Sequence, residues 1–97
     1  MTEPPDPTLP ANVRASGDVV WQEVEGQIVL LELNAGRYYA LDAVGSRMWQ
    51  VLVEESDVAQ AKDRLLTLFD VDAATLERDL AELIGRLAAV DLLVNAG

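Results

Sequence analysis

The chain has 97 residues, 51% of them hydrophobic, which is enough for one domain with one core and too short for two. It contains no cysteine and no histidine, which excludes disulfides, a thiol nucleophile and the commonest general base and metal ligand near neutral pH. A net charge of −10, with one lysine and six scattered arginines, opposes binding to a nucleic-acid backbone. We therefore expect no enzyme activity, no metal or other cofactor and no nucleic-acid partner.

All four prolines fall within the first fourteen residues, which carry little apolar content. Because proline disfavours helix interiors and has no amide hydrogen for a sheet, we expect a disordered, Pro-rich tail over residues 1–14. A single domain then occupies residues 15–97. No apolar run approaches the roughly 18 residues that cross a bilayer, and the N-terminus has no features of a secretory signal. These observations predict a cytoplasmic protein with no membrane partner.

Three consecutive segments have the composition of β-strands: Asp18–Val24, Ile28–Leu33 and Arg37–Leu41. Turn residues separate them, at Glu25-Gly26 and at Asn34–Gly36, so the segments predict an antiparallel meander. The middle segment, IVLLEL, is almost continuously apolar. This pattern is typical of a strand whose two faces are both at least partly covered.

The spacing of apolar residues becomes helical at Asp42, which predicts a helix to about Glu54. A second helix is expected from Val58 to about Phe69, and a third from the cap Asp72 to about Val90. The following residues, Asp91-Leu92-Leu93-Val94, suit either a short closing strand or an extended tail. The fold class is therefore α+β, with a three-stranded antiparallel sheet followed by three helices. The apolar stripe of the third helix consists of Leu76, Leu80, Leu83, Ile84 and Leu87.

In a three-stranded meander the third strand, Arg37–Leu41, lies at an edge of the sheet. An uncovered edge exposes backbone donors and acceptors, on which an extended peptide can dock as an added strand. The leucine stripe of the third helix could form the floor beneath that strand. Successive strand residues face opposite sides, so one of Tyr38 and Tyr39 faces the helices and the other could belong to a binding surface. Trp21 and Trp49 are expected to anchor the core.

Asp79 is unusual because aspartate is a poor helix former and this one lies in the middle of the third helix. One interpretation is a solvated polar face, with Asp79 paired to Arg86 or to another basic residue. The other is a groove edge, where the carboxylate accepts hydrogen bonds from a bound backbone. The sequence alone leaves both interpretations open.

Three segments together resemble the PqqD-like family: LLELNAGRYYALDAVGSRMW, FDVDAATLERDLAELIGRL and the terminal DLLV. The resemblance covers about Asp18 to Val94. It implies a winged helix-turn-helix domain that binds the leader segment of a ribosomally made precursor peptide between the third strand and the third helix. It also favours the groove interpretation of Asp79, because an aspartate near the start of the third helix belongs to the family pattern.

Among these domains the chain looks most like the stand-alone leader-recognition proteins of lasso-peptide biosynthesis. The resemblance implies delivery of the precursor to a separate leader peptidase and possibly to a macrocyclase. The alternative, a winged-helix transcription factor, needs a basic recognition helix, whereas Asp72–Val90 carries more acids than arginines. The candidate peptide-binding residues are Arg37, Tyr38, Tyr39, Ala40, Leu41, Leu76, Asp79, Leu80, Leu83, Arg86 and Leu87.

Overall fold

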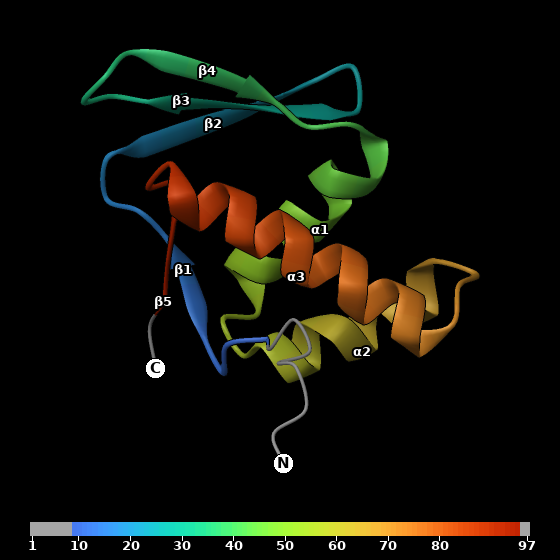
Figure 1. Ribbon diagram of the computed structural model, residues 1–97. Helices are drawn as coiled ribbons and strands as arrows, with labels where there is room; N and C mark the ends of the chain where they lie inside the picture. Colours follow the sequence, from blue (N-terminus) through green and yellow to red (C-terminus); the bar gives the residue numbers. More distant parts are fainter. Residues whose placement is uncertain (1–8, 96–97) are drawn as a thin grey trace.

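The computed structural model describes residues 9–95 and contains a sheet layer packed on a layer of helices (Figure 1). The predicted three-stranded antiparallel sheet followed by three helices is confirmed, and no end of these elements differs from the prediction by more than one residue. The sheet has the order β2-β3-β4, so β2 and β4 are its two edges. The elements of the sheet and the helical layer are β2 Val19–Val24, β3 Gln27–Glu32, β4 Arg37–Ala40, α1 Ala43–Glu54, α2 Val58–Leu68 and α3 Ala73–Ala89.

A second, two-stranded sheet joins the beginning and the end of the described chain. It pairs β1, Val13–Ala15, antiparallel with β5, Leu93–Asn95, which is the closing strand that the sequence allowed. Val13 is buried, and its amide donates to the carbonyl of Ser56 at 3.1 Å. The Pro-rich tail predicted for residues 1–14 therefore extends too far along the chain. The last proline is Pro10, and the residues after it have backbone amides that can donate to a sheet. Residues 1–8 lie outside the described residues.

The hydrophobic core fills the space between the inner face of the sheet and the helices. Trp49 of α1 is completely buried at its centre, as expected. Trp21 packs edge-to-face against it with 5.2 Å between the ring centroids, but it keeps 42% of its surface exposed. The expectation that both tryptophans are core anchors is therefore correct for Trp49 only, because Trp21 lies on the edge strand β2 with no neighbouring strand to cover it.

Ser46 links the end of β4 to β3 and α1. Its buried hydroxyl accepts the amide of Ile28 at 2.7 Å and donates to the carbonyl of Leu41 at 3.2 Å. Two backbone groups at the end of the β3–β4 ladder are thus satisfied through a helix side chain rather than by each other. This arrangement fixes the place where the chain leaves β4 and enters α1.

Each helix begins at an aspartate whose carboxylate accepts a backbone amide of the first turn. Asp42 accepts the amide of Gly45 at 2.7 Å, and Asp57 accepts that of Gln60 at 3.1 Å. Asp72 accepts that of Thr75 at 2.7 Å. The hydrogen bond from the Thr75 amide holds the pKa of Asp72 below its ordinary value of 3.8.

This shift makes the stability that Asp72 contributes dependent on pH. Because the folded pKa is lower, the contribution is complete above pH 3.8 and is lost as the pH falls through the folded value. The Asp72→Asn variant retains a cap that does not titrate. We expect the parent to melt at a higher temperature than the variant by a margin that is larger near neutral pH than in acid. Thermal unfolding by circular dichroism would measure it, and a difference that stays constant with pH would contradict the assignment.

Candidate functional site

The backbone of β4 presents an open edge beside α3. The amide of Leu41 donates to the carbonyl of Ile28 at 2.9 Å, which identifies this pair as a hydrogen-bonded pair of the ladder. In an antiparallel ladder such pairs alternate along the strand, so Tyr39 with Leu30 and Arg37 with Glu32 are also bonded. The amides and carbonyls of Tyr38 and Ala40 consequently point away from β3, toward the free edge.

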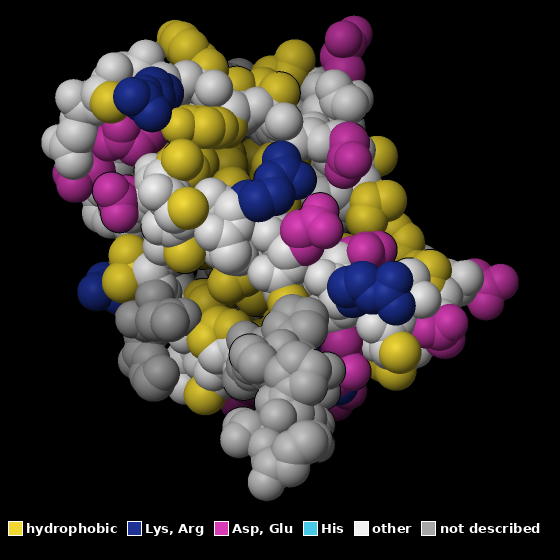
Figure 2. All heavy atoms as spheres, viewed as in Figure 1, with side chains coloured by type: hydrophobic (Ala, Val, Ile, Leu, Met, Phe, Trp, Pro, Cys, Tyr) yellow, Lys and Arg dark blue, Asp and Glu magenta, His cyan; other side chains and the backbone are white. Residues whose placement is uncertain are grey.

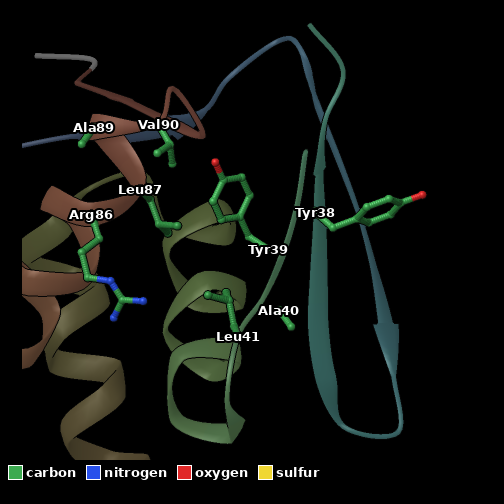
Figure 3. Close-up of a pocket in the computed structure, with 8 residues that line it drawn as sticks. All are labelled: Tyr38, Tyr39, Ala40, Leu41, Arg86, Leu87, Ala89 and Val90. Atoms are coloured by element: carbon green, nitrogen blue, oxygen red, sulfur yellow. The ribbon is translucent and has the colours of Figure 1, made fainter. Parts of the chain in front are cut away.

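A cavity of about 520 Å³ lies between this edge and the C-terminal half of α3 (Figure 3). The side chain of Tyr39 points toward α3, whereas Tyr38 projects to the opposite side of the sheet, as strand alternation predicts. The side chains that α3 turns toward Tyr39 are apolar, except for the guanidinium of Arg86. The lining residues are Tyr38, Tyr39, Ala40, Leu41, Arg86, Leu87, Ala89 and Val90.

A second cavity of about 320 Å³ lies between α3 and the beginning of α1. Arg86 lines both cavities, which therefore adjoin at this side chain. The second cavity has an apolar part and three carboxylates, but within residues 9–95 no group of acidic side chains is arranged to hold a metal ion. Its lining residues are Asp42, Val44, Gly45, Met48, Asp79, Glu82, Leu83 and Arg86. We call the two cavities together the α3 groove.

Most of the residues predicted from the sequence meet at the α3 groove. Tyr38, Tyr39, Ala40, Leu41, Arg86 and Leu87 line its first cavity, and Asp79 and Leu83 line its second. Arg37 lies on β4 and is exposed, but it lines neither cavity.

Leu76 and Leu80 do not belong to the α3 groove. Both are buried in the core and line neither cavity. The sheet lies over the C-terminal half of α3, while the N-terminal half lies beside α2, so the first part of the leucine stripe packs against helices (Figure 1). We therefore assign these two leucines to the core and correct the expectation that the whole stripe forms the groove floor.

The sequence interpretation missed the contribution of α1 to the α3 groove. Val44, Gly45 and Met48 line the second cavity, and Val44 is exposed although it fits the apolar helical spacing. The glycine at position 45 fits the helix cap, because a Cβ there would lie only 3.2 Å from Oδ1 of Asp42. The remaining missed residues are Asp42, Glu82, Ala89 and Val90.

Charged and hydrophobic side chains occupy different parts of the surface around the α3 groove. Figure 2 shows hydrophobic atoms exposed between the sheet and α3, with acidic and basic side chains beside them along the helix. Asp79 forms no ion pair with another described residue, so the pairing with Arg86 that the sequence allowed is not formed. Its exposed carboxylate is instead available at the wall of the second cavity.

This architecture defines a small α+β domain with an open strand edge next to an apolar groove. The family model of the coenzyme PQQ synthesis protein D, PqqD, matches residues 27–93, so the chain belongs to the PqqD family. No sequence among the curated proteins matches it. Within the described part of the chain, no helix has the length and apolar character needed to cross a bilayer.

Two solved structures are similar to this one. The first, TbiB1 in complex with the TbiA(beta) leader peptide, is 37% identical with a TM-score of 0.80, over 87% of this chain and 98% of that chain. The second, lasso peptide synthetase B1 complexed with the leader peptide, is 23% identical with a TM-score of 0.77, over 87% of this chain and 99% of that chain. The first is a relative within the family, and the second supports the fold.

Proposed function

We propose that this protein binds the leader segment of a ribosomally made precursor peptide as a strand added to β4. The observation that carries the proposal is the open edge at Tyr38 and Ala40, placed directly beside the α3 groove. The relative that is 37% identical is a complex with a leader peptide, which supports the same class of ligand.

The open edge of β4 and the α3 groove contribute to leader binding in different ways. Backbone hydrogen bonds to Tyr38 and Ala40 tolerate any leader sequence and supply affinity and direction. Alternate leader side chains then enter the first cavity, where Tyr39, Leu87 and Val90 favour apolar groups. Arg86, between the two cavities, is placed to donate hydrogen bonds to a carbonyl or a carboxylate of the leader.

We also propose that the bound precursor is delivered to separate enzymes, a leader peptidase and a macrocyclase, and that this protein performs no covalent chemistry itself. The absence of cysteine and histidine from the sequence supports a purely binding role. The alternative of a DNA-binding protein has no support in α3, because its exposed charges are Arg78 and Arg86 against Asp79 and Glu82, so the helix is not basic.

Fluorescence polarisation tests the proposal with a labelled synthetic copy of the TbiA(beta) leader peptide, which is bound in the structure of the 37% identical relative. The control is a peptide of the same composition in scrambled order. We expect saturable binding of the leader and at least tenfold weaker binding of the scrambled peptide, about 1.4 kcal/mol. Equal binding of both peptides, or a DNA duplex that binds at low salt more tightly than the leader, would refute it.

Replacing Asp79 with alanine should weaken leader binding about 2–10-fold, which corresponds to one hydrogen bond of about 0.5–1.5 kcal/mol. The exposed carboxylate lines the second cavity and forms no ion pair with a described residue, so its removal leaves the fold intact. Asp63→Ala, at an exposed position of α2, is the matched control. The same polarisation assay, with circular dichroism of both variants, measures the effect. Equal affinities of the two folded variants would remove Asp79 from the site.

A further inference from the structure

Two polar residues are buried in the described part of the chain, and they lie at opposite ends of β4. Glu32, which is 6% exposed, is the last residue of β3 and precedes the turn that leads into β4. Ser46, which is 3% exposed, lies in the first turn of α1, the helix that follows β4. Burying a carboxylate or a hydroxyl costs free energy unless hydrogen bonds replace those to water. The partners of both side chains are backbone groups that flank β4.

The carboxylate of Glu32 holds the turn before β4. Its Oε2 accepts the amide of Asn34 at 2.8 Å, and its Oε1 accepts that of Ala35 at 2.9 Å. The backbone carbonyl of Glu32 accepts the amide of Gly36 at 2.9 Å. One residue therefore accepts three successive amides of the turn. The next residue, Arg37, begins β4 and pairs with Glu32 in the ladder.

The hydroxyl of Ser46 holds the other end of the strand. The amide of Leu41 donates directly to the carbonyl of Ile28. The return bond, from the Ile28 amide to the Leu41 carbonyl, is replaced by the hydroxyl, which accepts from the first group and donates to the second. Between these two ends, β4 has β3 as its only neighbouring strand.

The leader site depends on the register of β4. A slip of one residue would turn Tyr39 away from α3 and would exchange the amides that point to the open edge (Figure 3). The strand has four residues, so few ladder bonds resist such a change. Neither Glu32 nor Ser46 lines the α3 groove. An effect of either side chain on leader binding therefore has to pass through β4.

We propose that Glu32 and Ser46 are positioning residues for leader binding, which hold β4 in the register that directs the backbone of Tyr38 and Ala40 toward the leader. This inference rests on the proposed function. A strand that is already ordered loses little conformational entropy when a peptide pairs with it. Without these hydrogen bonds, ordering β4 would offset part of the binding free energy, and the affinity for the leader would fall.

Glu32→Ala tests the proposal against a matched control, Asp57→Ala. Asp57 carries the same charge and also accepts a backbone amide, but at the beginning of α2. Fluorescence polarisation of the labelled TbiA(beta) leader peptide measures the affinity of each folded, full-length variant. Glu32→Ala should weaken binding about tenfold, whereas Asp57→Ala should bind within about twofold of the parent. Ser46→Ala, which removes one bridging hydroxyl, should weaken binding about threefold.

Hydrogen exchange of the free protein supplies a readout that a merely structural role would not change. The amides of Tyr39 and Leu41 donate to β3, so their exchange reports the local opening of β4. In Glu32→Ala both should exchange about tenfold faster relative to the amides of α2. In Asp57→Ala this ratio should stay at or below that of the parent.

Each further result has a defined meaning. If the parent does not bind the leader peptide, the proposed function fails and the inference fails with it. If the parent binds and Glu32→Ala binds equally well, or if Asp57→Ala loses as much affinity, the inference alone is overturned. Weaker binding by Glu32→Ala without faster exchange in β4 would also overturn it. Unchanged affinity of Ser46→Ala would remove that residue from the proposal.

Glu32→Gln decides if circular dichroism reveals that Glu32→Ala is unfolded. This variant keeps the size of the side chain and one acceptor oxygen, so it should fold. Its leader affinity should lie between that of the parent and a tenfold loss, with faster exchange confined to β4. Parental values of both quantities in Glu32→Gln would contradict a role for the second carboxylate oxygen and overturn the inference.

Discussion

Replacing Ala40 with proline should reduce leader binding about 5-fold to 150-fold, or about 1–3 kcal/mol. The amide of Ala40 points to the open edge of β4, and proline removes this donor and leaves a leader carbonyl without a partner. The bond from Leu41 to Ile28 does not involve this amide and should persist. Edge strands tolerate proline where the missing amide faces outward, so the variant should fold. Fluorescence polarisation with the labelled leader measures the loss.

The opposite edge of the sheet provides a matched control. The amide of Leu33 donates to the carbonyl of Asp18, so by alternation the amide of Glu23 on β2 also points outward. Glu23→Pro therefore makes the same backbone change at an edge that we do not assign to the leader. We expect its leader affinity to match that of the parent. If Glu23→Pro weakens binding as much as Ala40→Pro does, the leader is not bound at β4.

Leu80 and Leu83 should respond to shortening in different ways, although both belong to one apolar stripe. Leu80 is completely buried in the core, so Leu80→Ala should lower the free energy of unfolding by about 2–5 kcal/mol. The affinity of the folded protein for the leader should remain that of the parent. Leu83 lines the second cavity, so Leu83→Ala should weaken leader binding by about 1–3 kcal/mol as well as reduce stability.

Urea denaturation and leader titration, both in the cold, separate the two effects. Total stabilities of small domains are about 5–15 kcal/mol, so Leu80→Ala leaves some margin. Leu80→Val, which opens a smaller cavity, serves if the alanine variant is unfolded. A folded Leu80 variant that has lost leader affinity, together with a Leu83 variant that has kept it, would reverse our assignment of the two leucines.

The order and type of the elements follow from the sequence because their signals are local. The spacing of apolar residues becomes helical at Asp42, and the predicted cap Asp72 accepts a first-turn amide of α3. The edge position of β4 follows from its being the last strand of a meander. These signals also predict that Tyr38 and Tyr39 face opposite sides, because the side-chain period of a strand is fixed by its geometry.

Only the tertiary structure decided which residues of the stripe meet the groove. A helical period identifies the buried face of α3 but not the element that covers each part of it. Helices cover Leu76 and Leu80, whereas the edge of the sheet opens a cavity at Leu87, and α1 opens another at Leu83. The sequence also did not predict that β1 pairs with β5 or that Trp21 is partly exposed, because both depend on segments that are distant in the sequence. Whether a side chain is buried depends on the residues that surround it in space, and a local sequence pattern does not identify those residues.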